Sequence, residues 1–356
     1  MTIENFEFQS LAADVHFGPG KVSQLPGLIG DKKAFVIAEE RQQAIVDQLS
    51  TELGAKNVVP FREVGQHVPA GLVAQAAAVY VSEGCEILVA IGGGSTIGLA
   101  KALALETSHP IIAVPTTYAG SEMTNIWGIT SAAGAKTTGR DARVLPAHVI
   151  YDPDLTITLP KKLAATSAMH AMAHLMEAIY APDVNPVTYI TSLYGMKQMM
   201  IGMLILSREK KLSANANNLL LLGAFLGGKG LREVAMSLHH KAAHVLSDTF
   251  ALEHSHVHTV LQPYVLEYQW GSLVNKTKED LKQALMNPYP PMALYDAAKV
   301  MDAPFSLKEI GFKAEDIEKA VDIMLEQPYA NPAPLDRDKL IKMMQRAYDG
   351  KLLGSE

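Results

Sequence analysis

Histidines are concentrated in one short stretch of this chain. Half of its twelve histidines fall between residues 239 and 258, in HHKAAHVLSDTFALEHSHVH. They are His239, His240, His244, His254, His256 and His258. Neutral imidazole binds transition metals, and imidazole also accepts and donates protons near neutral pH. The density of rings therefore predicts an active site that uses them either as metal ligands or as proton carriers.

A second segment adds two histidines that would face the same way. His170 and His174 lie four residues apart in TSAMHAMAHLMEA, a helical pattern that places both rings on one face. One such histidine alone is more often a packing residue, but the clustering favours a common site. Glu177 follows one turn later and could either orient an imidazole or lie on the helix surface.

A glycine-rich turn points to a second function, the binding of a diphosphate. In EILVAIGGGSTIGLAKALAL an apolar run ends at Gly92, Gly93 and Gly94, and a helical pattern follows. Without Cβ atoms the backbone can approach an anion closely, and the helix directs free N–H groups at it. A tight turn without a ligand is the alternative. A second turn after the next apolar run, PTTYAGSEM at 115–123, favours a nucleotide site.

Glu39 follows the apolar run KAFVIA, where an acidic side chain can accept hydrogen bonds from the ribose hydroxyls. Because a carboxylate there would repel a 2′-phosphate, we expect NADH to be preferred over NADPH. The expected cofactor-binding residues are Glu39, Gly92, Gly93, Gly94, Ser95, Thr116, Thr117, Tyr118 and Ser121.

Two kinds of element must position these residues. Five short apolar runs alternate with helical stretches up to residue 158, at 33–38, 57–61, 86–91, 110–115 and 148–152. Continuous apolar runs are typical of parallel strands that are buried on both faces. Long helical periodicities follow Pro160. We therefore predict an α/β dinucleotide-binding domain over residues 1–158 and an all-helical domain over 159–356.

Composition excludes several classes of partner. The formal charge is −6 with both signs interspersed, so no basic face is offered to nucleic acid or to anionic lipid. The start lacks a signal-peptide pattern, and the longest apolar runs, such as LLLLGAFL, are too short to cross a bilayer. We expect a soluble cytoplasmic protein. The single Cys85 permits no internal disulfide.

Motifs along nearly the whole chain resemble the iron-containing alcohol dehydrogenase superfamily, and within it most closely the maleylacetate reductases. The motifs are VHFGPGK (15–21), QHVP (66–69), GGGSTIGLAKA (92–102), PTTYAGSEMT (115–124), YDPDLTITLP (151–160), MHAMAHLMEAIYA (169–181), LHHKAAHVL (238–246) and NPAP (331–334). Most of the superfamily carries Asp where this chain has Gly98, and maleylacetate reductases typically carry Gly.

The resemblance implies the architecture of iron-containing alcohol dehydrogenases and of dehydroquinate synthase. A nicotinamide cofactor would bind the N-terminal domain, with catalysis in the cleft between the domains. In metal-dependent members an Asp and three His bind iron or zinc, and these positions correspond here to His170, His174, His240 and His254. His170 departs from that pattern, and maleylacetate reductases generally work without metal. Both a metal site and a metal-free site stay open.

The resemblance also implies an activity, the reduction of maleylacetate or a related unsaturated oxo-diacid to a 3-oxoadipate-type product in the catabolism of aromatic compounds. His244 is the expected proton donor. His240, His254 and His174 are expected to bind the substrate carboxylates or a metal, and Tyr118 is a further expected catalytic residue. A homodimer is the expected assembly and a small dicarboxylate the expected substrate. The alternatives are a metal-dependent alcohol dehydrogenase and, from another class, a non-enzymatic metal-binding protein.

Overall fold

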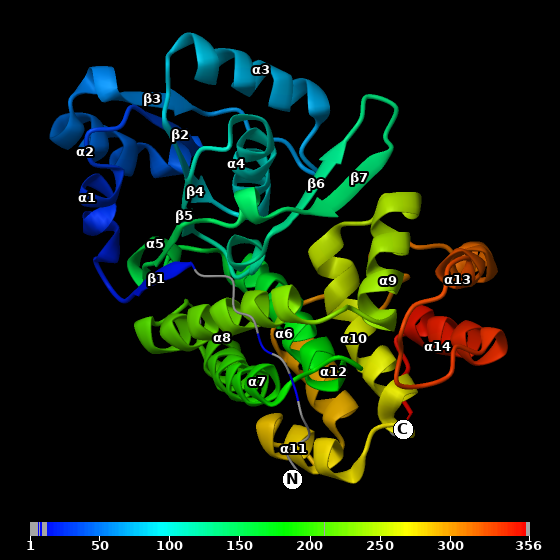
Figure 1. Ribbon diagram of the computed structural model, residues 1–356. Helices are drawn as coiled ribbons and strands as arrows, with labels where there is room; N and C mark the ends of the chain where they lie inside the picture. Colours follow the sequence, from blue (N-terminus) through cyan, green and yellow to red (C-terminus); the bar gives the residue numbers. More distant parts are fainter. Residues whose placement is uncertain (1–5, 7, 9–12, 210, 354–356) are drawn as a thin grey trace. The chain divides into compact units, whose positions relative to one another are not determined.

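The computed structural model describes residues 6, 8, 13–209 and 211–353 of the chain (Figure 1). It forms two compact units, Ser10–Thr158 and a second that comprises Met1–Gln9 with Leu159–Glu356. We call them the α/β unit and the helical unit. None of the helices that the structure describes combines the length and the apolar character needed to span a membrane.

The α/β unit is built on a six-stranded parallel sheet, as predicted. Its strands are β1 (Asp14–Phe17), β2 (Ala34–Ala38), β3 (Val58–Phe61), β4 (Ile87–Gly92), β5 (Ile111–Pro115) and β8 (His148–Tyr151). A separate antiparallel hairpin, β6 (Ile126–Thr130) with β7 (Lys136–Arg140), was not expected from the sequence. Both hairpin strands are only partly buried, so they lack the apolar pattern by which the sheet strands are recognised.

Helices cover both faces of this sheet. The helices are α1 (Leu25–Ile29), α2 (Gln43–Leu53), α3 (Ala70–Ser82), α4 (Gly94–Thr107) and α5 (Pro153–Thr156). Alternate residues of β2 point to opposite faces: Phe35 packs in a core with α3 and α4, and Val36 in a core with α1 and α2. Burial on both faces explains why the strands read as continuous apolar runs.

The sheet order places the predicted cofactor turns together. The order β1-β8-β5-β4-β2-β3 reverses the direction of chain progression between β2 and β4. Ala38 of β2 pairs with Ile91 of β4, and Gly92 pairs with Pro115 of β5, so three strands end level with one another. Doubly wound sheets bind ligands outside the carboxyl ends of the strands at such a switch point.

The helical unit contains no strand among its described residues, which agrees with the predicted all-helical region. Its helices are α6 (Lys161–Tyr180), α7 (Pro186–Arg208), α8 (Ala214–Glu233), α9 (Leu238–His244), α10 (His254–Trp270), α11 (Asn275–Ala284), α12 (Pro290–Val300), α13 (Ile317–Leu325) and α14 (Arg337–Asp349). A core of buried apolar side chains joins α9, α10, α12, α13 and α14.

Glycines allow α6, α7 and α8 to approach closely. A Cβ at Gly227 of α8 would lie 2.9 Å from the carbonyl oxygen of Ala171 in α6. A Cβ at Gly223 would lie 2.7 Å from Met199 of α7. The methionines at 196, 199, 200 and 203 are buried and fill this interface, which is their common use in cores. Helix α6, which carries His170 and His174, is therefore in close contact with the backbone of α8.

Candidate active site

Helix α6 presents its two histidines to α9 and α10 inside the helical unit. The rings of His170 and His174 lie 4.7 Å apart, as expected for residues one turn apart on one face. The His174 ring stacks on His240 of α9 at 4.9 Å, and the His170 ring stacks on His258 of α10 at 4.2 Å. The structure thus brings the two histidine-bearing segments of the sequence together.

Glu177, the next charged residue on α6, caps the start of α9. Its carboxylate accepts hydrogen bonds from the backbone N–H groups of Ser237, His239 and His240 at 2.8–3.3 Å. These are among the first N–H groups of a helix, which have no partner within it. The same carboxylate accepts a hydrogen bond from Nδ1 of His240. Of its two possible roles, Glu177 therefore takes the one that orients an imidazole.

The Glu177 carboxylate is ionised although it is fully buried. Burial would raise its pKa, but the hydrogen bond and charge of His240 and the N–H group of His239 lower the pKa below its usual value. An ionised carboxylate only accepts hydrogen bonds. His240 must therefore carry a proton on Nδ1.

The other ring nitrogen of His240 continues the network to α6. Nε2 of His240 lies 2.8 Å from Nδ1 of His174. Glu177, His240 and His174 form one chain of hydrogen bonds, and we refer to it as the Glu177 chain.

A second chain of imidazoles runs through α10. Nε2 of His239 lies 2.8 Å from Nδ1 of His258, whose Nε2 lies 3.1 Å from Nε2 of His254. Nδ1 of His254 in turn lies 3.0 Å from Oγ of Ser247. Ser247 belongs to a π-helical turn (Val245–Thr249) that follows α9. Its hydroxyl gives Nδ1 of His254 a hydrogen-bond partner.

Burial keeps much of this cluster uncharged. It lowers the pKa of His239 to about 3, with His240 acting in the same direction and Glu177 opposing it. Burial and the neighbouring imidazoles hold the pKa values of His170 and His258 well below the usual range. These three rings are therefore neutral at pH 7. They can donate and accept hydrogen bonds or bind a metal, but they supply no positive charge.

Acid should destabilise the helical unit through His239. Its pKa is 6.5 in an unfolded chain and about 3 here, so below pH 6.5 only the unfolded state binds the proton. The free energy of unfolding therefore falls as the pH is lowered from 6.5. The contribution of His239 to this loss is roughly 2 kcal/mol between pH 6.5 and 5. Urea unfolding at pH 7 and pH 5 measures the loss.

The matched comparison uses one buried and one partly exposed histidine. The variant His239→Phe should lose less stability between the two pH values than the unchanged protein. His256, which pairs with Glu253 at 3.6 Å outside the cluster, provides the control. His256→Gln should retain the full loss, and an equal loss in all three proteins would contradict the assignment.

His244 lies at the open edge of the cluster. Its side chain is 46% exposed, and its Nδ1 lies 3.6 Å from the carboxylate of Asp248. Its ring is 5.4 Å from the ring of His254. This position gives the expected proton donor contact both with solvent and with the buried rings.

Three of the imidazoles fit a metal ion. One ring nitrogen from each of His170, His254 and His258 lies within 4.8 Å of the other two. Tetrahedral zinc spaces its nitrogen ligands about 3.4 Å apart, so a small closure of the rings would bring them onto one ion. His174 and His240, also in the expected ligand set, are engaged with each other instead. The four-residue set stays a prediction beside this three-residue one.

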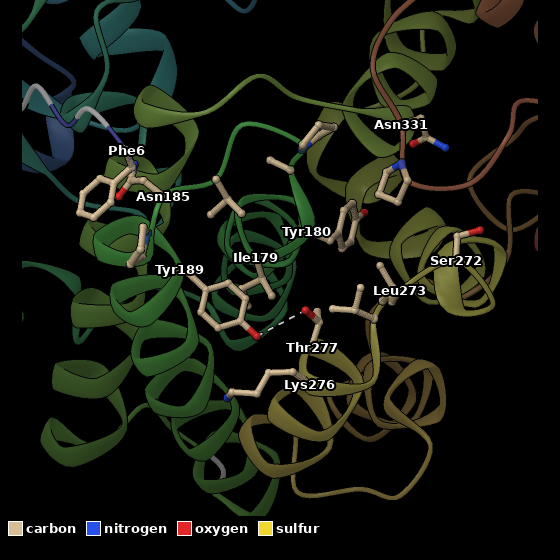
Figure 2. Close-up of a pocket in the computed structure, with 16 residues that line it drawn as sticks. Phe6, Ile179, Tyr180, Asn185, Tyr189, Ser272, Leu273, Lys276, Thr277 and Asn331 are labelled. Atoms are coloured by element: carbon tan, nitrogen blue, oxygen red, sulfur yellow. Dashed lines mark hydrogen bonds between the residues drawn. The ribbon is translucent and has the colours of Figure 1, made fainter. Parts of the chain in front are cut away.

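A pocket of about 800 Å³ lies elsewhere in the helical unit (Figure 2). Its walls include Tyr180, Tyr189 and Thr277, and the hydroxyls of the last two are 3.5 Å apart. None of its lining residues belongs to the expected catalytic, metal or cofactor sets. The pocket therefore receives no role in the chemistry.

In the α/β unit the glycine turn leaves space for a ligand. A Cβ at Gly92 would lie 2.3 Å from Oγ1 of Thr96, and one at Gly93 would lie 3.2 Å from Thr117. At Gly94 it would meet only Ala119, at 3.8 Å. Gly92 and Gly93 are thus required by internal packing. Gly94, the first residue of α4, leaves an open approach to the N–H groups of that helix.

The second turn supplies polar groups beside the first. The N–H group of Thr116 donates to the carbonyl of Gly92 at 2.9 Å, which ties the two turns together. Oγ1 of Thr116 is buried and has no hydrogen-bond partner within the described chain. A buried hydroxyl without a partner is rare in proteins, and this one is available to a ligand that would occupy the turn. The cradle therefore fits a dinucleotide.

Two of the expected cofactor-site residues, Tyr118 and Glu39, are already engaged with other side chains. Tyr118 is fully buried with its hydroxyl bonded to Thr156, and burial raises its pKa, which argues against proton donation. The carboxylate of Glu39, at the end of β2, lies 3.0 Å from Nε of Arg41. An arginine at this position can accompany a 2′-phosphate, so Arg41 bears on the choice between NADH and NADPH.

The turn that carries the QHVP motif packs against α4. His67 and Val68 both have positive φ, at 59° and 52°. A Cβ at Gly98 would lie 2.7 Å from Cγ2 of Val68. Thr130 of the hairpin holds this turn, because its N–H donates to the carbonyl of Val68 and its hydroxyl to that of His67. Gly98 is therefore required by the conformation of this turn.

Two central rings of the histidine cluster have no assigned role in the sequence-based prediction. His239 and His258 were counted in the cluster but given no role, although the His258 ring lies within 6 Å of five other imidazole rings. The spacing of His258 four residues after His254 was the available signal.

Comparison with known proteins covers both units. Residues 12–153 match the family model described as iron-containing alcohol dehydrogenase, and residues 164–348 match the model for the C-terminal part of that family. The chain is 40% identical over 350 residues to a maleylacetate reductase of Pseudomonas sp. strain P51, covering 98% of this chain and 99% of the relative. It is also 40% identical over 353 residues to a maleylacetate reductase of Burkholderia cepacia, covering 97% and 98%.

Solved structures give the same match. A putative alcohol dehydrogenase from Ralstonia eutropha JMP134 superposes with a TM-score of 0.93 at 39% identity, covering 98% of this chain and 99% of that one. Maleylacetate reductase from Agrobacterium tumefaciens superposes with a TM-score of 0.92 at 33% identity, with the same coverage. The similarity therefore includes the fold of both units.

Proposed function

Because this chain belongs to the iron-containing alcohol dehydrogenase family of oxidoreductases, we propose that it is a maleylacetate reductase that uses NADH. The observation that carries the proposal is the full-length similarity to several proteins of that one activity. The open cradle at Gly94 and the hydrogen-bonded imidazole cluster support it. Family membership sets aside the alternative of a non-enzymatic metal-binding protein.

The proposed reaction reduces a carbon–carbon double bond that is conjugated to a ketone. NADH, held by the turns at Gly94 and Thr116, would supply the hydride for the alkene carbon beside the carboxylate and would leave as NAD⁺. Negative charge moves to the ketone oxygen as an enolate, which then takes up one proton to give 3-oxoadipate. The protein must therefore supply hydrogen-bond donors to the oxygen and one acidic proton.

His244 suits the proton-donating role. Asp248 faces its Nδ1, so we assign proton transfer to Nε2. Because nearly half of the side chain is exposed, the ring can recover its proton from water. The neighbouring His254 is fixed by Ser247 and His258 and positions the anion rather than moving its proton.

The charge that binds a dicarboxylate must come from outside the buried rings. His170, His239 and His258 are neutral, and Lys241 of α9 is a cation close to them in the chain. Lys241 is partly buried and lies one turn before His244 on the helix. Both would face a substrate at the edge of the cluster.

A direct assay tests the proposal. Oxidation of NADH is followed by its absorbance with maleylacetate as substrate, and 3-oxoadipate is identified among the products. A kcat/KM for maleylacetate far above that for simple aldehydes and ketones supports the assignment. Turnover of alcohols and aldehydes without turnover of maleylacetate would contradict it.

A metal-dependent alcohol dehydrogenase is the second candidate, favoured by the approach of His170, His254 and His258. A metal held there would polarise the substrate carbonyl. We expect reductase activity that survives exhaustive chelation, because four imidazoles without a carboxylate give the ion no ligand charge. Activity assays before and after chelation, with elemental analysis, measure this.

If zinc or iron instead restores lost activity, single variants identify the ligand set. His258→Ala would abolish metal binding if the three-residue set is used, whereas His174→Ala would abolish it for the four-residue set. Metal content of the two purified variants separates the two cases.

The cofactor preference depends on Glu39 and Arg41. A carboxylate near the ribose repels a 2′-phosphate, so we expect kcat/KM to be higher with NADH than with NADPH. Glu39→Ser should shift the ratio toward NADPH by about tenfold, because Arg41 loses its partner and becomes available to phosphate. Glu40→Ser is the matched control. A native preference for NADPH would overturn the assignment.

We further propose a cytoplasmic homodimer that takes a small dicarboxylate as its substrate. The interspersed charges of the sequence support the location, and the resemblance supports the assembly. Sedimentation of the purified protein measures the assembly.

A further inference from the structure

A buried lysine in the α/β unit occupies a cage of oxygen atoms. Lys101 lies on α4, two turns after Gly94, and only 1% of it is exposed. Its Nζ donates to the carbonyl oxygens of Ser121, Thr124 and Ile126 at 2.6, 2.8 and 3.0 Å. It also lies 2.8 Å from the hydroxyl oxygen of Thr124.

The cage favours the charged form of the lysine. An ammonium group has three N–H donors for these four oxygens, whereas a neutral amine has two and would turn its lone pair toward an oxygen. Burial lowers the pKa of Lys101 to about 7, and the nearby carboxyl of Glu122 opposes this. Burial in turn raises the pKa of Glu122, which accepts a hydrogen bond from Tyr151. Neutral oxygens therefore provide most of the stabilisation of the cation.

The caged segment is the one that leaves the second cofactor turn. Ser121 begins a short 3₁₀ helix (Ser121–Met123) directly after that turn, and Ile126 begins β6. At the other end of the turn, the N–H group of Thr116 is bonded to Gly92. The turn at 116–120 is thus anchored to the glycine turn at its start and to α4 at its end.

The anchor joins the two halves of the cradle through one helix. The first turn of α4 forms the approach to the diphosphate, and Lys101 is two turns further along the same rigid element. Movement of the second turn away from α4 would displace the Thr116 hydroxyl from the ligand. The contacts of one ammonium group with these four oxygens resist that movement.

We propose that Lys101 is a positioning residue of the cofactor site, which holds the second turn at the distance from α4 that the dinucleotide requires. The inference rests on the proposed use of NADH. Lys101 contacts no ligand itself and acts through the segment Ser121–Ile126.

The first test replaces the charge without a large change of shape. Lys101→Met removes the ammonium donor that these four oxygens share, and we expect the dissociation constant for NADH to rise about tenfold or more. Leu103→Ala is the matched control, because this fully buried residue of α4 packs in the core between the sheet and the helices. It should lower the thermal midpoint while NADH affinity changes less than about twofold.

The second test restores the missing group. Lys101→Ala removes a side chain equal in length to n-propylammonium, and the variant is purified in the presence of that ion so that it folds with the cage filled. Removal of the ion should weaken NADH binding, and its return should restore the affinity. n-Propanol, which has the same chain length and no charge, should not.

The outcomes separate this inference from the proposed function. Unchanged NADH affinity in Lys101→Met, or an equal loss of affinity in Leu103→Ala, would overturn the role of Lys101. Failure of the unchanged protein to bind NADH in the same titration would instead contradict the proposed function.

Discussion

Replacing Glu177 by glutamine is expected to lower kcat by about 10- to 100-fold, the usual effect of removing a group that orients an active-site imidazole. Glutamine presents an NH₂ group to the N–H groups of α9 and cannot accept all the bonds that the carboxylate accepts. His240 would lose the partner that keeps its proton on Nδ1. His174 would then face a ring whose orientation is no longer fixed.

Steady-state kinetics and urea unfolding together check this prediction. The free energy of unfolding should fall by about 1–3 kcal/mol, because buried N–H groups lose an ionised acceptor. Glu253→Gln is the control, since Glu253 caps α10 in the same way but with its side chain 47% exposed. It should leave kcat within about twofold. Equal kcat in the unchanged protein and Glu177→Gln would remove the Glu177 chain from the mechanism.

Replacing Gly94 by valine is expected to raise the dissociation constant for NADH by about 100-fold or more, with the fold retained. A Cβ at Gly94 meets no protein atom closer than 3.8 Å, so the side chain enters the space where the diphosphate would lie. Loss of even part of the bonding to the first N–H groups of α4 would account for several kcal/mol of binding. Fluorescence titration with NADH measures the change.

A second glycine provides the matched control for this variant. Gly71 lies near the start of α3, as Gly94 does at the start of α4, and a Cβ there would meet nothing within 4 Å. Gly71→Val should leave NADH affinity unchanged. Circular dichroism shows whether both variants keep their helices. Unaltered NADH affinity in folded Gly94→Val would exclude this turn from the cofactor site.

The sequence predicted the parallel sheet and the glycine turn because both leave local signals. Buried strands read as continuous apolar runs, and a turn that admits an anion needs residues without side chains. The hairpin β6–β7 was missed because residues such as Thr137 and Thr138 are exposed. The short edge strand β1 carries no apolar run and was read only as part of a motif.

The histidine cluster was predicted as a set of residues but not as a network. Helical spacing places His170 beside His174, yet it cannot say which nitrogen of His240 faces Glu177. That choice depends on how α6, α9 and α10 pack, and the packing depends on contacts such as Gly227 against Ala171. The charge state of the rings could not be predicted for the same reason. Burial makes His239 and His258 neutral, and burial is a tertiary property.

The contact between Gly98 and Val68 makes these two positions epistatic. An aspartate at position 98, as in most of the superfamily, needs the space that Val68 now fills, and Val68 is held there by a turn with positive φ and by Thr130. Gly98 cannot be exchanged alone at low cost, although thirty positions separate it from Val68. An evolutionary path between the two forms of this signature must therefore pass through a change in the turn at 67–69 before, or together with, the change at 98.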